Sequence, residues 1–265
     1  MRAARAFAGF GTAAGTRTLP DEVAVALSFN GVTQAVMMAT PADLEDFARG
    51  FALTEGIADP AAIEAIEAAA VPGGIDLRLW LAPAAAARLT ERRRTMAGPV
   101  GCGLCGIESL AEATRALPPV TAMLTLPAAE LCDAAAALGR HQPLHDATRA
   151  VHAAAFVVPG QGIVMAREDV GRHNALDKLA GALIAAGIAP GSGAVVMTSR
   201  VSVDLVQKAA RMGAPVLIAL SAPTAAAVDL AAAAGVTLAA MARPERVEVY
   251  AHLGRITGAG ASHAA

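Results

Sequence analysis

The sequence predicts an α/β protein in which a layered C-terminal domain follows a smaller α+β part. From about residue 151 onward, short apolar runs typical of strands alternate with amphipathic helical segments over short connections, the pattern of a sheet covered by helices. The first hundred residues instead contain a hairpin signal and one isolated alternating strand. We therefore expect an N-terminal α+β part over residues 1–115, a connector over 116–150 and a C-terminal α/β domain over 151–265.

In the N-terminal part, apolar and polar residues alternate over residues 22–40 around Asn30-Gly31, the strongest two-residue signal for a β-hairpin. Thr40 and the proline after it predict a helix start, because Thr can cap the first turn and Pro suits it. This helix should end near Gly56. Beyond it we expect a short Ala/Glu-rich helix over 61–70, a half-buried strand over 75–81 and a helix over 83–94.

The connector predicts one helix, over residues 128–138. After it, the pattern predicts a hairpin of strands 153–158 and 163–167, helix 173–186, strand 193–198, helix 202–212, strand 215–220, helix 224–234 and strands 237–242 and 246–251. Because helices separate successive strands over much of this region, we expect a mainly parallel sheet.

Composition excludes several classes of function. The net charge of −2 gives no general attraction to nucleic acid, and one Trp, one Tyr and six Phe leave little aromatic surface for base stacking. Polar residues and glycines interrupt the apolar stretches before they reach membrane-spanning length. The N-terminus has no apolar block of the kind found in signal peptides. We expect a soluble cytoplasmic protein with neither a nucleic acid nor a membrane as partner.

The most informative motif is Gly-Cys-Gly-Leu-Cys-Gly at residues 101–106, which holds two of the three cysteines. Glycines let a loop adopt positive φ values and expose its side chains. The residues that follow read as the start of a helix, whose free N–H groups and dipole favour a thiolate. Both features suit Cys102 and Cys105 for sulfur chemistry.

Three other interpretations of this pair are weaker. Low cysteine usage argues against a disulfide staple. A zinc site needs about four ligands, and no second CxxC exists, so we expect no metal, although Cys132, His141 and His145 could complete a site if the fold brought them there. A thioredoxin-type pair would follow a strand, whereas this one follows an Arg-rich helix end and a Gly-Pro turn. Sulfur transfer or thiol exchange is the interpretation that remains.

Polar residues also gather at three strand-to-helix junctions. Arg172 and His173 stand at a predicted helix start, where the helix dipole disfavours cations, so an anionic partner is indicated. Ser199 and Arg200 follow the next strand, and Ser221 follows the third. Helix N-termini, hydroxyls and guanidinium groups together are the ingredients of a phosphate-binding face. The simpler alternative is that Asp169, Ser199 and Ser202 only cap helices.

Taken in order, these segments resemble the formate dehydrogenase accessory proteins of the FdhD family. Each segment alone is weak evidence, whereas the ordered set spans the chain from about residue 20 to 256 and is highly specific. The segments are residues 101–106, 40–51 with Thr54-Glu55-Gly56, 152–154, 167–178, 198–200 and 206–208, and the tail residues Arg243, Arg246, Tyr250 and His252.

The resemblance implies a cytidine-deaminase-like fold in the C-terminal domain, a homodimer and a role in sulfur transfer. In this family a cysteine desulfurase loads a persulfide onto the CxxC pair, so Cys102 would carry the sulfur and Cys105 would assist by exchange. The accessory protein then passes the sulfur to bis-molybdopterin guanine dinucleotide, the molybdenum cofactor that formate dehydrogenase requires.

The resemblance also implies that this cofactor is bound as cargo, with GDP as a mimic of its nucleotide end. The segment that matches the family's cofactor contact consists of Met241, Ala242, Arg243, Pro244, Glu245 and Arg246. Its first position is Phe in many members and Met here, so this chain has no aromatic side chain for a contact at that position. We add Arg172, His173, Ser199 and Arg200 as expected cofactor contacts, because they stand at the junctions where anions would gather.

Two further functions stay open. One is a chaperone that holds cofactor or apo-enzyme without catalysis. The other is a zinc-dependent hydrolase that uses Cys102, Cys105 and a histidine. A deaminase proper is disfavoured, because its H-x-E zinc signature is missing: two alanines follow His152.

Overall fold

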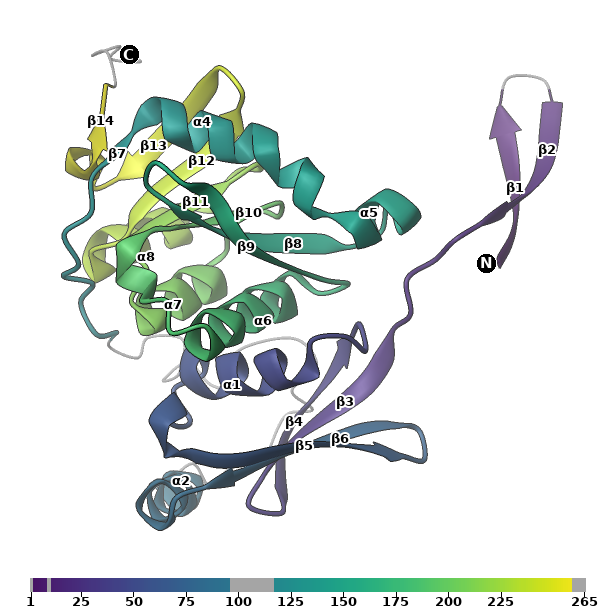
Figure 1. The fold of residues 1–265 in the computed structure, drawn as a ribbon, viewed down its shortest axis with the longest axis vertical. Helices are drawn as coiled ribbons and strands as arrows, with labels where there is room; N and C mark the ends of the chain where they lie inside the picture. Colours follow the sequence, from purple (N-terminus) through teal and green to yellow (C-terminus); the bar gives the residue numbers. More distant parts are fainter. Residues whose placement is uncertain (1, 9–10, 96–116, 259–265) are drawn as a thin grey trace.

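The computed structural model describes residues 2–8, 11–95 and 117–258. Figure 1 shows a larger unit, built on a six-stranded sheet with helices on both faces, above a smaller unit built on a four-stranded sheet. This arrangement confirms the mixed α/β class. Cys102 and Cys105 lie outside the described residues, and the division into two parts and a connector stays a prediction.

The large sheet has the strand order β13-β12-β11-β10-β8-β9. Only β10, β11 and β12 run parallel, while β8, β9 and β13 pair antiparallel. The expectation of a mainly parallel sheet is therefore wrong, because two short hairpins supply the flanking strands, and strands joined by a tight turn must run antiparallel. The strands are β8 (His152–Val158), β9 (Gly162–Asp169), β10 (Ala194–Met197), β11 (Val216–Ala219), β12 (Thr237–Arg243) and β13 (Arg246–Ala251).

Helices cover both faces of this sheet, as the alternation of its buried side chains requires. Phe156, Val195 and Leu217 point into one core, together with helices α6 (Arg172–Ala185), α7 (Val203–Met212) and α8 (Ala225–Ala234). Their neighbours along the strands, such as Val196 and Ile218, point into the other core, against α4 (Ala128–Ala137). The four predicted helices are confirmed. A short helix, α5 (Pro143–Thr148), and the two-residue strands β7 (Leu126–Pro127) and β14 (Ile256–Thr257) were not predicted.

The smaller sheet has the order β4-β3-β6-β5. Its hairpin turn is confirmed, since Asn30 (φ 48°) and Gly31 (φ 79°) both adopt the left-handed conformation that a tight two-residue turn needs. Its strands are β3 (Val23–Phe29), β4 (Val32–Ala39), β5 (Ile63–Val71) and β6 (Gly74–Leu81), and α2 (Pro83–Thr95) follows. The helix predicted over 61–70 is wrong, because pairing with β6 overrides the helix propensity of its Ala and Glu residues.

Helix α1 (Leu44–Thr54) joins the two units by crossing α6. A Cβ added at Gly50 would lie 1.7 Å from the Asp177 carbonyl oxygen, and one at Gly181 would lie 1.8 Å from that of Asp46. The two backbones therefore touch where each helix has a glycine. Thr40 does not cap α1 as expected, since Asp43 is the N-cap residue and makes no side-chain capping bond.

An N-terminal hairpin of β1 (Arg2–Ala8) and β2 (Gly11–Arg17) precedes this unit and was not predicted. Figure 1 shows it standing away from both sheets. Among the described residues, no helix is long and apolar enough to cross a membrane.

The glycine contact leads to a prediction about stability. Gly181→Ala should lower the free energy of unfolding by about 3 kcal/mol, because α1 and α6 must separate to admit a methyl group. Urea unfolding followed by circular dichroism measures this change. Gly139→Ala is the matched control, since a Cβ there meets nothing within 4 Å. Equal stability of the two variants would show that the crossing adjusts without cost.

Candidate functional site

The three strand-to-helix junctions that are rich in polar residues lie along one edge of the large sheet. His152 at the start of β8 pairs with Asp169 at the end of β9, and Ala154 pairs with Met197 at the end of β10. Since β10, β11 and β12 are parallel, their carboxyl ends share that edge. Open α/β sheets bind ligands in the crevice outside the carboxyl ends of their strands. The shared edge is therefore our candidate site.

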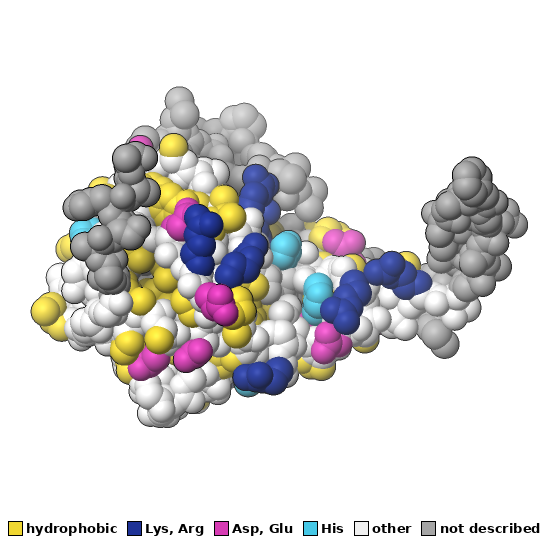
Figure 2. Space-filling model, turned by 90° about the horizontal axis from the view of Figure 1, so that it is seen from above, with side chains coloured by type: hydrophobic (Ala, Val, Ile, Leu, Met, Phe, Trp, Pro, Cys, Tyr) yellow, Lys and Arg dark blue, Asp and Glu magenta, His cyan; other side chains and the backbone are white. Residues whose placement is uncertain are grey.

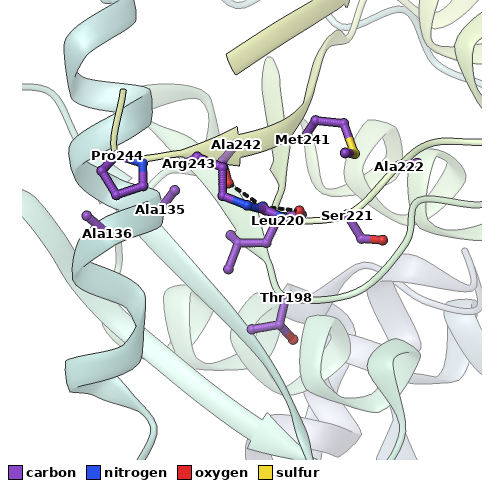
Figure 3. Close-up of a pocket in the computed structure, with 10 residues that line it drawn as sticks. All are labelled: Ala135, Ala136, Thr198, Leu220, Ser221, Ala222, Met241, Ala242, Arg243 and Pro244. Carbon is purple, nitrogen blue, oxygen red and sulfur yellow. Dashed lines mark hydrogen bonds between the residues drawn. The ribbon is translucent and has the colours of Figure 1, made fainter. Parts of the chain in front are cut away.

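A hollow of about 650 Å³ lies at this edge. Figure 3 shows how it is built: Ala135 and Ala136 of α4 form one wall, Thr198 and the loop Leu220–Ala222 follow β10 and β11, and Met241–Pro244 closes it from β12. Small side chains leave the space open. Four of the six residues in the predicted cofactor segment line this hollow.

Arg243 is the charged residue of the hollow. Its Nη1 donates hydrogen bonds to the carbonyl oxygens of Leu220 and Ala242, which hold the guanidinium across the cavity (Figure 3). A β-bulge between Ala240 and Arg243, with Met241 in a left-handed conformation (φ 52°), turns this end of β12. The two backbone bonds use only one terminal nitrogen of Arg243. The guanidinium is thus positioned in advance for an anion.

The last two residues of the predicted segment lie elsewhere. Glu245 and Arg246 are exposed and are not part of the lining, and Arg246 forms an ion pair with Glu248. Glu248 also accepts a 2.6 Å hydrogen bond from the Tyr250 hydroxyl. Arg246 is therefore held along β13 by a partner on its own strand.

Arg172 and His173 begin α6 at the same edge, and both are half-buried. Arg172 Nε and His173 Nε2 are buried atoms with no hydrogen-bond partner among the described residues, although His173 Nε2 lies 3.7 Å from an Asp204 carboxylate oxygen. Burial, together with the charges of Arg172 and Lys208, lowers the pKa of His173 to about 4. His173 is therefore a neutral imidazole at pH 7.

His152 was left without a role by the sequence, yet it lies at this edge. Its Nδ1 is 3.4 Å from the Thr198 hydroxyl, and Thr198 lines the hollow. Burial and the nearby charges of Arg172 and His145 lower the pKa of His152. The only sequence signal for this placement was that His152 opens a buried strand.

The two residues after β10 differ in exposure. Ser199 is buried and donates a 3.0 Å hydrogen bond to the carbonyl oxygen of Arg200, while the Arg200 side chain is exposed at the edge. Ser202 is the N-cap residue of α7 but makes no side-chain capping bond. Arg200 therefore stays available as a contact, and the capping interpretation of Ser199 and Ser202 is wrong.

Several residues of the 167–178 motif make buried hydrogen bonds and ion pairs that hold the two units together. The Asp169 carboxylate is fully buried and accepts hydrogen bonds from the backbone N–H groups of Thr40 (3.0 Å) and Gly171 (2.7 Å). Lys178 Nζ lies 2.7 Å from the same carboxylate and donates to the Thr40 carbonyl oxygen. Asp169 therefore joins the chain before α1 to the start of α6, rather than only capping a helix.

A second buried network of ion pairs and hydrogen bonds lies at the other end of α1. Lys208 of α7 contacts Asp177 of α6 at 2.8 Å and pairs with Glu55. The Thr54 hydroxyl donates a 2.6 Å hydrogen bond to Asp177. Burial raises the pKa of Asp177 to about 6, against the opposing effect of Lys208. This network locks α1, α6 and α7 together.

No group of three His, Cys, Asp or Glu side chains in the described part of the chain could hold a metal ion. Cys132 is buried on α4, and the CxxC pair lies outside the described residues. The expectation that no metal is needed stays a prediction.

The low pKa of His173 predicts an acid sensitivity. Between pH 6.5 and about 4 the unfolded chain binds a proton at this residue and the folded chain does not, so the free energy of unfolding falls as the pH falls. His173→Gln should remove about 2 kcal/mol of the stability loss between pH 7 and pH 4.5. Asp177, whose raised pKa acts in the opposite direction, is present in both proteins and cancels in the comparison. Parallel pH profiles of the two proteins would contradict the prediction.

Comparison with known proteins gives the family. The model of the FdhD/NarQ family matches residues 20–257. The sulfur carrier protein FdhD of Agrobacterium fabrum is 51% identical over 92% of this chain and 91% of its own length. Its counterpart in Bordetella bronchiseptica is 46% identical over 89% and 86%.

A solved structure agrees with these relatives. The crystal structure of a protein from Desulfotalea psychrophila, described as a formate dehydrogenase accessory protein, superposes with a TM-score of 0.74. It is 25% identical and covers 96% of this chain and 97% of its own. The resemblance seen in the motifs thus extends to the whole fold, and the chain belongs to the FdhD/NarQ family.

Proposed function

We propose that this chain is a cytoplasmic sulfur carrier that takes persulfide sulfur from a cysteine desulfurase and passes it to bis-molybdopterin guanine dinucleotide, for use by formate dehydrogenase. The observation that supports this most is the hollow at the sheet edge, lined by Met241–Pro244, in a family whose members include proteins named sulfur carriers. The CxxC pair supplies the thiols.

The loading step is a thiol exchange. The Cys102 thiolate attacks the outer sulfur of the desulfurase persulfide, the S–S bond of that persulfide breaks, and the desulfurase thiolate leaves. Cys102 then carries the sulfur. Attack of the Cys105 thiolate on the inner sulfur of Cys102 expels hydrosulfide and leaves a Cys102–Cys105 disulfide. A thiol reductant must reduce this disulfide before the next cycle.

The sheet edge would bind the cargo by its guanine nucleotide end. Arg243 reaches across the hollow and would pair with a phosphate, and Arg172 and Arg200 extend the positive charge toward the other junctions. The half-buried His173 and the buried Ser199 lie next to them in the chain and would position these groups rather than carry charge. In this proposal the C-terminal domain is cytidine-deaminase-like, with its hollow used for cargo in place of a deaminase substrate.

The function predicts a specific mass change at Cys102. Incubation with a cysteine desulfurase and cysteine should add about 32 Da, one sulfur atom, to the intact chain, because a reactive thiolate accepts the persulfide sulfur. Cys102→Ala should lose the adduct, and Cys132→Ala should keep it. An adduct that maps to Cys105 or Cys132 in the unmodified chain would show that the assignment is wrong. A protein that never loads but still binds GDP would be a chaperone.

The position of the hollow predicts that two nearby arginines contribute differently to GDP binding. Arg243→Ala should weaken GDP binding about ten- to hundredfold, the range for losing a hydrogen bond to a charged group. Arg246→Ala should change it little, since Arg246 is paired with Glu248 outside the lining. Isothermal titration of both variants gives the affinities, and exposed Arg149→Ala serves as the control. Equal losses of GDP affinity in the Arg243 and Arg246 variants would show that the nucleotide binds at the exposed turn between β12 and β13 and not in the hollow.

A further inference from the structure

His152 has a ring nitrogen that is open to a ligand. It begins β8, and its Nδ1 lies 3.4 Å from the Thr198 hydroxyl. The other ring nitrogen, Nε2, has no hydrogen-bond partner in the described part of the chain and is not a buried atom. Because side chains alternate along a strand, His152 shares a face with Ala154, which belongs to the core formed with α6. Nε2 can therefore meet a molecule at the sheet edge.

Arg172 brings an uncompensated charge to this histidine. It is the first residue of α6, and its charge acts on His152. Its Nε is buried without a partner, and its two terminal nitrogens reach solvent and make no hydrogen bond or ion pair within the described residues. Figure 2 shows further Lys, Arg and His side chains gathered on the upper face of the molecule, and the segment before β8 adds the exposed Arg140 and His141. A half-buried guanidinium without a counter-charge is unfavourable, and a bound anion would supply that charge.

The acidic residues of β9 cannot supply it. Asp169 lies opposite His152 in the strand register, but its carboxylate is fully buried and pairs with Lys178. The Glu168 carboxylate accepts two hydrogen bonds from backbone N–H groups of α5. Both carboxylates are therefore already used inside the fold.

The surroundings of His152 keep its imidazole neutral in the free chain. Burial lowers its pKa most, followed by the charges of Arg172 on α6 and His145 on α5. Thr198, the neighbour after β10, carries no charge. An anion against Nε2 would act in the opposite direction, because an opposite charge favours the protonated ring. Binding of an anion there is then linked to uptake of a proton.

Thr198 connects His152 and Arg172 to the hollow. Its side chain lines the cavity (Figure 3), and the same hydroxyl contacts His152. Arg243 supplies a guanidinium inside the cavity. An anion with two linked phosphates therefore has a charged group to meet on each side of Thr198.

We propose that His152 and Arg172 bind the second phosphate of a guanine nucleotide whose first phosphate meets Arg243, and that His152 takes up a proton from solvent as it binds. This role rests on the proposed function, because the hollow must receive the nucleotide. It adds the side chains that recognise the pyrophosphate and makes cargo binding sensitive to pH. The protonated Nε2 donates a charge-assisted hydrogen bond, and Arg172 offers its terminal nitrogens.

Isothermal titration with GDP-mannose at several pH values tests this role. The second phosphate of this ligand is esterified, so the ligand does not ionise between pH 5.5 and pH 8 and any pH dependence comes from the protein. The unmodified chain should bind it about tenfold more tightly at pH 5.5 than at pH 8, the change that one unit of pKa difference between bound and free His152 produces. Titrations in two buffers with different ionisation enthalpies should show proton uptake near pH 6.5.

His152→Gln keeps a neutral hydrogen-bonding group that cannot take up a proton. It should weaken GDP-mannose binding at pH 5.5 about tenfold and remove the proton uptake. GMP, which lacks the second phosphate, should bind the variant and the unmodified chain equally. The matched control is His252→Asn, because His252 contacts Thr237 at the opposite end of β12 and has a left-handed φ of 51° that Asn tolerates. This control should retain the pH dependence.

The outcomes separate this role from the proposed function. GDP-mannose binding that stays equally pH-dependent in His152→Gln would overturn the role of His152 and leave the proposed function standing. An unmodified chain that binds neither GDP-mannose nor GDP would contradict both. An equal loss of GMP and GDP-mannose affinity would show that His152 does not contact the second phosphate, and the proposal would be wrong. Circular dichroism checks the fold, and His152→Asn takes the place of the Gln variant if that variant does not fold.

Discussion

The close crossing of α1 and α6 is the contact on which the rest of the structure depends. Gly50 and Gly181 bring the two backbones together, and a buried ion pair lies at each end of the contact: Lys178–Asp169 and Lys208–Asp177. Removing one partner of such a pair leaves an uncompensated charge in a low-dielectric interior, which costs several kcal/mol. The two lysines also lie 5.9 and 5.5 Å from the ring centroids of Phe47 and Phe51 on α1. The smaller unit is therefore held against the larger unit in one arrangement.

This constraint also shapes the candidate site. Asp169 ends β9 and accepts hydrogen bonds from Gly171 and Asn174 at the start of α6. These bonds hold Arg172 and His173 in fixed positions at the sheet edge. Glu55, directly after α1, and Asp204 and Lys208 of α7 are near His173, and burial keeps its imidazole neutral. The positive charge available to an anion at this edge then comes from the guanidinium groups of Arg172, Arg200 and Arg243.

The sequence predicted most elements of both units, because hydrophobic period, turn residues and segment length agree with one another; the Asn30-Gly31 turn of the smaller sheet is the clearest case. It failed at β5, where Ala and Glu favour a helix locally and only pairing with β6, fixed by distant residues, makes a strand. The sequence singled out the segment that contains Arg243, which lines the hollow. The separation of Arg243 from Arg246 depends on a β-bulge that no local sequence pattern predicts. His152 was missed because a half-buried strand residue looks the same whether or not it borders a cavity.

The motif at residues 167–178 shows why a dense run of polar residues is ambiguous. Asp169, Asn174, Asp177 and Lys178 point into the contact between the units and are satisfied there, whereas Arg172 keeps a buried nitrogen without a partner in the described part of the chain. Helical spacing separates the two sets: residues 174, 177 and 178 share the face that meets α1, and residue 172 lies on another. One face of this segment therefore packs against α1 and holds the two units together, and another face places Arg172 at the sheet edge. Changes on the first face should therefore act on activity only through stability, and changes at Arg172 should act on binding in a folded protein.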